Sequence, residues 1–425
     1  MHRINLENPN DLAELARDYY ARGFSQSEIA KTRKIKQSTV SLWLQRARER
    51  GVVLVDIDPE FGVSGSEHRD RSRQLRDQYE LKDCCVVDPG KVKFSERLRG
   101  DELHTVIANT VGERLRDWIQ PGDHIVTGGG RAPVKVARFI KRTPPLRREV
   151  RISPLSGRIW TGSWQEDGSE NLQRPLDADD AARLLAFAFE HEPGTRFSQV
   201  GLPLYQEESS VKTTIEEECV FTPGGGWNTT WGLQPPARAL VGVGVLHPDS
   251  GHRIAELVNK IASNREYKVA RHLRWAASKF KEAMAFAHDN KLPHFGDVSN
   301  RLFPALLLPS QLKESGLSGT KLDKLYSTLC LKLHELNARA VVMEWEHLRG
   351  IPSVWAVAGG ELKTNVLWTL LICRYLEGDK SKSIVKELST DVETAERLQR
   401  ALQDFKSAPD EHRNWYREMI GKIFV

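Results

Sequence analysis

The chain has 425 residues, of which 40% are hydrophobic and 28% are charged. That length predicts two or three domains, and that composition is ordinary for globular protein. No apolar run approaches the roughly 20 residues that a membrane-crossing helix needs; the longest, residues 365–376, contains Arg374 and is interpreted as a buried helix. The N-terminus lacks the apolar core of a signal peptide, and five cysteines without paired spacings fit a reducing compartment. We therefore expect a cytoplasmic protein without membrane contact.

The formal net charge of +5 is concentrated at the start of the chain. Residues 1–55 contain ten Lys and Arg against six Asp and Glu, and residues 31–50 contain seven against one. A solvated helix face is one explanation for such a cluster. A module that binds a polyanion explains the concentration better.

Three helices are predicted in this basic region. Residues 10–22 place their apolar side chains on one face, and Ser25 with Glu28 forms the capping-box pattern that begins a second helix. Residues 37–50 form a third helix with Val40, Trp43, Leu44 and Ala47 on one face. Two such helices joined by a tight turn predict a helix-turn-helix, whose second helix enters the major groove of DNA. A three-helix protein-interaction module is the alternative.

A helix-turn-helix over these residues also predicts which side chains meet double-stranded DNA. Side chains near the start of the third helix that are not needed for the core would contact base edges; these are Lys36, Gln37, Ser38, Thr39 and Ser41. Basic side chains on either side would contact phosphates; these are Lys31, Arg33, Lys34, Arg46 and Arg48. One such module covers only half an operator, so we expect at least a dimer.

The next residues predict a boundary between domains. Residues 52–58 alternate apolar and polar residues, which predicts a short strand and a winged-helix-like module over residues 1–58. Residues 59–82 are densely charged and predict a linker helix, or the first helix of the next domain. Residues 83–425 then form an effector-binding and oligomerisation domain.

Strands and helices alternate in this larger part. Residues 84–87 and 124–126 are predicted strands, and the second leads into Gly128, Gly129, Gly130 and Arg131 before a helix over residues 134–140. A strand, a glycine turn and a helix can accept an anion through backbone amides and the helix dipole. A plain tight turn is the alternative. The sequence contains neither a GxGxxG motif nor a P-loop, which disfavours dinucleotide binding and ATP hydrolysis.

The N-terminal segment "GFSQSEIAKTRKIKQSTVSLWLQRARERGVV" resembles the helix-turn-helix of SorC-family regulators. Three residues depart from that family's pattern: Arg33 and Lys34 replace the usual Leu and Gly of the turn, and Lys36 replaces a Ser. Lys34 stands where the turn favours positive φ, which costs about 1 kcal/mol for a non-glycine residue. We expect the module to tolerate this and its operator to differ from those of relatives.

The resemblance continues in the family's order through the larger part of the chain. It rests on the segments "GDHIVTGGGRAPVKVA", "VRISPLSG", "GLPLYQ", "ARALVGVGVL", "FGDVSNRLF", "VWAVAGGELKTNVLWTLL" and "LSTDVETAERL". It implies an α/β fold: the helix-turn-helix is followed by a Rossmann-like effector domain of the sugar-phosphate-isomerase type. It also implies a homo-oligomer, dimer or tetramer, whose effector is a sugar, a sugar phosphate or a related small molecule.

The same resemblance implies the effector-binding residues. The glycine turn and Arg131 would hold a phosphate, Asp297 would accept sugar hydroxyls and Lys363 would meet a charged or carbonyl group. The full implied set is Gly128, Gly129, Gly130, Arg131, Gly244, Asp297, Gly359, Gly360 and Lys363. Ala132 stands where the family usually has Thr, and Pro133 lacks a backbone N–H, so the turn offers fewer donors to a phosphate. A ligand without a phosphate group is therefore the alternative. Asp297 could instead cap a turn, and Lys363 could be a solvated lysine at a helix start.

Two insertions make this chain longer than its relatives. The chain exceeds its relatives near residues 216–236, which are interpreted as a pocket lid, a partner surface or a disordered tether. It also exceeds them near residues 250–293, a helical and basic stretch that we expect to pack outside the sensor; contact with DNA or another subunit is the alternative. No compact zinc pattern is formed by the neighbouring residues His288, Asp289, His294 and Asp297, so we expect neither a metal nor a cofactor.

An enzyme is the alternative function. A sugar-phosphate isomerase or deaminase would use Asp297 as base and Lys363 as electrophile. The fused DNA-binding module favours a regulator over such an enzyme.

Overall fold

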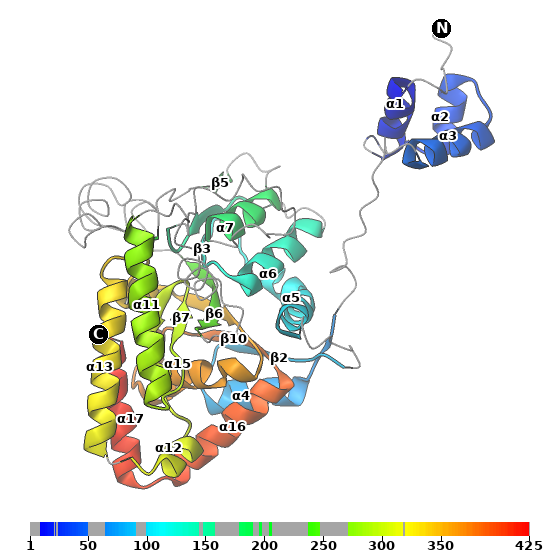
Figure 1. Cartoon of the computed structure of the whole chain (residues 1–425). Coiled ribbons are helices and arrows are strands. Elements are labelled where there is room, and N and C mark those ends of the chain that lie inside the picture. The colour runs from blue at the N-terminus through cyan, green and yellow to red at the C-terminus, as the bar shows by residue number, and fades with distance from the viewer. Residues whose placement is uncertain are drawn as a thin grey trace. The chain divides into compact units, whose positions relative to one another are not determined.

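The chain forms two compact units, Met1–Gly62 and Val63–Val425. The structure is a computed structural model, drawn in Figure 1. It describes residues 9–20, 22, 24–49, 64–90, 99–143, 148–157, 178–189, 195–197, 204–205, 237–246, 271–317 and 319–424. The expected strand at residues 52–58 and the insertion at residues 216–236 lie outside these residues, as does the first part of the second insertion.

The first unit is the three-helix module that the sequence predicts. Its helices are α1 (Pro9–Tyr20), α2 (Gln26–Arg33) and α3 (Gln37–Glu49). The apolar faces of all three meet in one small core, to which they contribute Leu12, Leu15, Ala16, Ile29, Ala30, Val40, Trp43, Leu44 and Ala47. The helical spacing of apolar residues in the sequence therefore produces this packing directly.

The turn between α2 and α3 follows from local side-chain chemistry. The Ser25 side chain accepts a hydrogen bond from the Glu28 backbone N–H at 3.2 Å, and the Glu28 carboxylate accepts one from the Ser25 N–H at 2.8 Å. This reciprocal capping box begins α2 where predicted. Lys34 ends α2 in the left-handed region, at φ +52°, as its place in the turn predicted.

The second unit is built on a largely parallel sheet. Its strands are β1 (Ser66–Glu67), β2 (Asp83–Asp88), β3 (His124–Thr127), β4 (Arg151–Pro154), β5 (Arg196–Phe197), β6 (Arg238–Val245), β7 (Gly296–Val298), β8 (Arg301–Phe303), β9 (Ser353–Val357) and β10 (Glu387–Asp391). Their order in space is β1-β2-β10-β9-β6-β3-β4-β5, with β7 paired to β6 and β8 to β7. Strands β2, β10, β9, β6, β3, β4 and β5 run parallel, and β1, β7 and β8 are antiparallel additions.

This order creates a switch point between β3 and β6. From β3 the chain moves outward through β4 to β5, and from β6 it moves the other way through β9 to β10. The connections that leave β3 and β6 therefore diverge at the carboxyl ends of these two strands, as they do beside the ligand crevices of open α/β sheets. Ligands of open α/β sheets bind in such crevices.

Helices cover both faces of the sheet (Figure 1). Cys85, Val87 and Trp355 pack with α5, α6 and α7 on one face. Their neighbours in the strands, such as Cys84 and Val86, face the larger core that α4, α11, α13, α15, α16 and α17 close. Alternation between two buried faces is the pattern of a parallel sheet covered on both sides.

The helices of this unit have the following bounds. They are α4 (Arg69–Gln78), α5 (Arg99–Trp118), α6 (Arg131–Arg142), α7 (Ala178–Phe187), α11 (Arg271–Asp289), α12 (Pro309–Ser315), α13 (Gly319–Asn337), α14 (Trp345–Gly350), α15 (Thr364–Leu376), α16 (Val392–Ser407) and α17 (Asp410–Ile423), with the 3-10 helices η2 (Glu361–Lys363) and η3 (Lys380–Lys382). Within the described ranges, no helix is long and apolar enough to cross a membrane.

Two expectations about organisation need correction. The helix expected as a linker within residues 59–82 is α4, which buries Leu75 in the larger core, so it is the first helix of the second unit. The described part of the second insertion is α11, expected to pack outside the sensor; it contributes Ala276, Phe280 and Ala283 to the same core. In both helices the apolar residues on one face decide the packing, although the sequence of α4 is mostly charged and that of α11 carries several basic residues.

Candidate functional site

The predicted base-reading residues lie on the outer side of the helix-turn-helix. Gln37, Ser38 and Ser41 are exposed, Thr39 is half-buried, and Lys36 immediately precedes α3 and is exposed. The same side of α3 carries Leu42, which is 45% exposed, and Gln45. The sequence analysis did not include Leu42 or Gln45, although their spacing from Ser38 and Ser41 along a helix was a sufficient signal.

Among the predicted phosphate contacts, Arg33 is engaged inside the module. Its guanidinium pairs with the carboxylate of Asp18 at 2.5 Å and with that of Glu14 at 3.8 Å, both on α1. Burial works to raise the pKa of Asp18, but hydrogen bonds from Arg33 and Arg22 hold it below its ordinary value. Lys31 and Lys34, by contrast, are exposed. Arg33 therefore joins α2 to α1 and is poorly placed to be a phosphate contact.

In the second unit, the predicted effector residues come together at the carboxyl ends of the strands. Gly128, Gly129 and Gly130 connect β3 to α6, whose first residue is Arg131. Gly244 of β6 is the direct cross-strand partner of Asp297 of β7. Lys363 ends η2, shortly after β9. These residues therefore surround the switch point between β3 and β6.

Asp297 holds a tight turn as well as facing the cluster. Its Oδ2 accepts a hydrogen bond from the Asn300 backbone N–H at 2.9 Å. Ser299 and Asn300 form the two-residue turn between β7 and β8, both with positive φ, as type I′ hairpins require. The Asn300 side chain donates to Ser156 Oγ at 3.0 Å. The turn-capping alternative for Asp297 is thus correct, and its carboxylate also acts on Lys363.

Lys363 is half-buried, and several charged groups influence its amine. Its Nζ lies 2.7 Å from Nε2 of the buried His104, on α5. Burial, with a smaller contribution from Arg131, lowers the pKa of Lys363 to about 8, although the charges of Asp297 and Asp391 oppose the shift. The alternative that Lys363 is a solvated lysine is therefore wrong.

Asp391 and the glycines after β9 form the support for Lys363. The Asp391 carboxylate accepts hydrogen bonds from the backbone N–H groups of Gly360, at 2.8 Å, and Thr394, at 3.0 Å. Gly360 has φ +99°, a conformation that side-chain-bearing residues rarely adopt. Gly359 and Gly360 therefore shape the turn and present Lys363.

Three residues of the cluster were not predicted from the sequence. Lys135 of α6 is 4% exposed and donates to Thr105 Oγ1 at 2.6 Å. His104 and Lys135 have no motif around them, because α5 and α6 meet only through tertiary packing. Asp391 ends a strand and caps the next helix, so the segment "LSTDVETAERL" did contain its signal.

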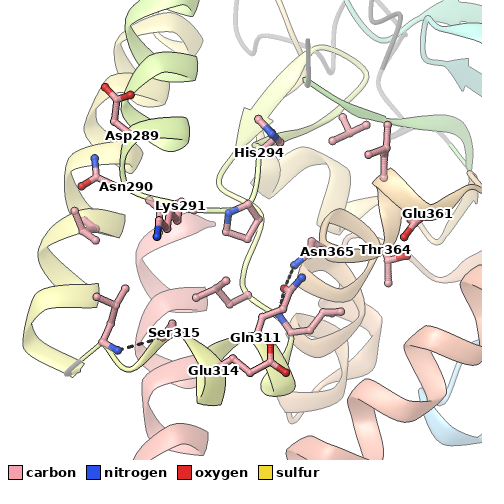
Figure 2. A pocket seen from close by; sticks show the side chains of 18 of the residues that line it. Asp289, Asn290, Lys291, His294, Gln311, Glu314, Ser315, Glu361, Thr364 and Asn365 are labelled. Carbon is pink, nitrogen blue, oxygen red and sulfur yellow. Dashed lines mark hydrogen bonds between the residues drawn. The ribbon is translucent and has the colours of Figure 1, made fainter. Parts of the chain in front are cut away.

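A separate cavity of about 760 Å³ adjoins the same turn (Figure 2). It lies among the end of α11, the start of α15 and α12, and Asn365 donates to Gln311 Oε1 across it at 2.7 Å. Its described lining includes Glu361 and Thr364, on either side of Lys363 in the sequence, and none of the predicted effector residues. Within the described ranges, no group of three or more His, Cys, Asp or Glu could hold a metal ion.

Comparisons with known proteins identify regulators. The sorbitol operon regulator of Klebsiella pneumoniae is 25% identical over 155 residues, which are 36% of this chain and 46% of that protein. The transcriptional regulator YjhU of Escherichia coli, described as uncharacterized, is 29% identical over 139 residues, 33% of this chain and 40% of that protein. The chain thus matches less than half the length of each relative. No protein-family model matches it.

One solved structure shares the fold over most of its length. It is a transcriptional regulator from Streptococcus pneumoniae TIGR4, with a TM-score of 0.51 at 15% identity, and the match covers 78% of this chain and 96% of that chain. The predicted fold class is confirmed by this likeness and by the sheet described above. The resemblance to SorC-family regulators, predicted from the sequence motifs, is confirmed by the relatives.

Proposed function

We propose that this protein is a DNA-binding transcription regulator that responds to a sugar, a sugar phosphate or a related small molecule. The observation that carries the proposal is the presence in one chain of two different sites. One is a capped helix-turn-helix with an exposed basic and polar side. The other is a polar cluster at the switch point of a Rossmann-like sheet. The kinship with named regulators supports the pairing.

The proposed DNA contacts divide into two kinds. Residues Lys36 to Ser41 contact base edges in the major groove, and Lys31 and Lys34 contact phosphates of a double-stranded operator. Arg33 is removed from the phosphate contacts because Asp18 holds it. A homo-oligomer, dimer or tetramer, supplies two modules to a two-fold related operator.

The proposed effector combines hydroxyl groups with an anionic group. Asp297 is a hydroxyl acceptor, and Arg131 and Lys363 are cations that favour an anion. The first amides of α6 add to this preference, although Pro133 contributes none. The Klebsiella relative is named for the sorbitol operon, so we include sorbitol and its phosphates among the probes.

Two measurements test the proposal together. The full chain is used to select duplexes from a random DNA library, and the unfolding temperature is measured with hexitols, hexoses and their phosphates. We expect an enriched, two-fold related sequence and a rise in unfolding temperature with at least one probe; a ligand at 100 times its Kd adds about 2.7 kcal/mol. Gln37→Ala should relax the selected sequence. Absence of any enriched sequence would refute DNA reading.

An enzyme of the isomerase or deaminase type is the second candidate. The observation that favours it is Lys363, an amine whose pKa burial and the neighbouring Arg131 lower to about 8, against the opposing charge of Asp297. Such an amine can act as a nucleophile near neutral pH. Turnover of hexose or amino-hexose phosphates by the purified protein, lost in Lys363→Met, would establish this candidate instead.

A further inference from the structure

Two hydroxyl groups near Asp297 are buried without hydrogen-bond partners among the described residues. They are Oγ of Ser299 and the phenol oxygen of Tyr205. The two side chains are 4% and 3% exposed. A buried hydroxyl that makes no hydrogen bond costs about 1–3 kcal/mol. Two such groups in one cluster therefore call for a functional explanation.

Ser299 lies directly against the glycine turn. A Cβ atom built on Gly128 would lie 1.9 Å from Ser299 Oγ and 2.9 Å from its Cβ. The hydroxyl of Ser299 thus occupies the space beside the first residue of the β3–α6 connection. A hydroxyl at this place can donate to an anionic group held by the amides of that connection. Ala132 provides no hydroxyl of its own there.

Tyr205 lies close enough to the same aspartate to be affected by its charge. Its ring packs edge-on against Phe280, with ring centroids 5.9 Å apart. Burial raises the pKa of Tyr205 above its ordinary value, and the negative charge of Asp297 raises it further. The phenol therefore stays protonated, and its hydroxyl can both donate and accept a hydrogen bond.

The other buried tyrosines among the described residues of the unit each make at least one hydrogen bond. Tyr79 donates to the Leu398 carbonyl, Tyr416 to the Leu307 carbonyl and Tyr326 to the Ala305 carbonyl. Tyr326 also accepts a hydrogen bond from the Leu307 N–H at 3.1 Å. The fold thus satisfies buried phenols elsewhere, which makes the unpaired one beside Asp297 specific to this cluster.

We propose that Ser299 and Tyr205 are effector contacts that pair only when the ligand is bound, and that the ligand is a polyhydroxylated molecule carrying one anionic group. Ser299 donates to the anionic group at the β3–α6 connection. Tyr205 and Asp297 share a ligand hydroxyl. Both oxygens are shielded from solvent, so the ligand reaches them through a small shift of the β7–β8 turn. This inference rests on the proposed function and names the ligand class of its site.

The first test needs no ligand. Tyr205→Phe removes only an unpaired hydroxyl, so the ligand-free protein should unfold at the same temperature or a higher one. Tyr326→Phe is the matched control, because it removes a hydroxyl that makes two hydrogen bonds, and it should lower the unfolding temperature by several degrees. A loss of stability in Tyr205→Phe equal to that in Tyr326→Phe would overturn the inference.

The second test measures binding by calorimetry to the full chain. The probes are sorbitol 6-phosphate, glucose 6-phosphate, gluconate, sorbitol and inorganic phosphate. We expect a polyhydroxylated anion to bind more tightly than sorbitol or inorganic phosphate, and Tyr205→Phe and Ser299→Ala each to weaken its binding about tenfold. The control is Ser72→Ala on α4, which removes a hydroxyl that accepts a hydrogen bond from the Val86 N–H of β2; it should not change the affinity.

The outcomes distinguish an error in the proposed contacts from an error in the proposed function. If a probe binds and both variants retain full affinity, the contacts proposed here are wrong and the regulator remains supported. If no probe stabilises or binds the wild-type chain, the sugar-type effector itself is wrong, whatever the stability of Tyr205→Phe. Gluconate and the phosphates distinguish a carboxylate from a phosphate as the anionic group.

Discussion

At the scale of single residues, Gly128 marks the closest approach between two parts of the effector cluster. A side chain at this position would meet Ser299 of the β7–β8 turn, which follows Asp297 of β7 by two residues. The conformation of the glycine turn and the position of Asp297 are therefore linked by one steric contact. This packing requires a glycine at position 128 whether or not an anion is bound.

This contact gives the first prediction. Gly128→Ala should destabilise the protein by about 1–3 kcal/mol, as overpacked core substitutions do. The double variant with Ser299→Gly should recover most of that loss, because glycine removes the opposing side chain and accepts φ +52° easily. Denaturant unfolding of the single and double variants measures the coupling. Equal stability of Gly128→Ala with and without the second change would show that this contact does not exist.

Lys363 gives the second prediction, on pH. Its pKa falls from 10.5 in the unfolded chain to about 8 in the folded protein. Between these values the unfolded chain binds more protons, so stability rises with pH from about 8 to 10.5 and carries the full penalty below 8. Lys386 contributes in the same window, since its pKa is also lowered to about 8.

The measurement therefore compares variants. Lys363→Met should reduce, without abolishing, the rise in unfolding free energy between pH 8 and 10.5, because Lys386 remains. Lys324→Met, on the exposed side of α13, is the control and should leave the rise unchanged. If Lys363→Met shows the wild-type dependence, its amine is not held as described.

At the scale of elements, the ion pair between α1 and α2 separates structural from DNA-binding basic residues. Arg33→Ala should destabilise the first unit by about 1–3 kcal/mol, since it leaves the largely buried Asp18 carboxylate without its Arg33 hydrogen bond. Lys31→Ala should leave stability unchanged, weaken binding to all DNA alike and lower the salt slope by about 1. Hydrogen exchange in residues 9–49 and DNA titrations at several salt concentrations measure the two effects. Equal effects of both variants on exchange would contradict this division.

These elements also show what sequence could predict. The capping box of Ser25 and Glu28 and the positive φ of Lys34 depend on residues within a few positions, so sequence patterns were sufficient. Arg33 was predicted to contact phosphate because it lies in a basic stretch of the sequence. Its pairing with Asp18 was not predicted, because Asp18 lies fifteen positions earlier on another helix. A count of charges in a window does not reveal which of them are paired.

The effector cluster illustrates the same limit in the second unit. Asp297, Arg131 and Lys363 were predicted together because the resemblance to SorC-family regulators implied them as effector-binding residues. His104, Lys135 and Ser299 were not, since their proximity depends on how α5, α6 and the β7–β8 turn pack. Burial and missing hydrogen bonds, which mark Tyr205, exist only in the folded chain.

At the scale of the whole molecule, regulation requires that the two units communicate. DNA reading is proposed for residues 1–62 and effector binding for residues 63–425, which are separate compact units. An effector can change DNA affinity only if it binds one state of the protein more tightly than another. Typical coupling is about 1–3 kcal/mol, or roughly 5- to 150-fold in affinity.

Asp297→Asn tests this coupling more cleanly than a change to alanine. The amide oxygen of Asn can still accept the hydrogen bond from the Asn300 N–H, so the β7–β8 turn should persist while the charge is lost. We expect normal DNA affinity without effector, since Asp297 lies in the second unit, and loss of the response to the effector. Fluorescence anisotropy on the selected duplex, with and without the bound probe, measures both, and Asp404→Asn on the exposed side of α16 is the control. A full response in Asp297→Asn would move the effector site elsewhere, and the cavity beside Asn365 and Gln311 would then be the next to examine.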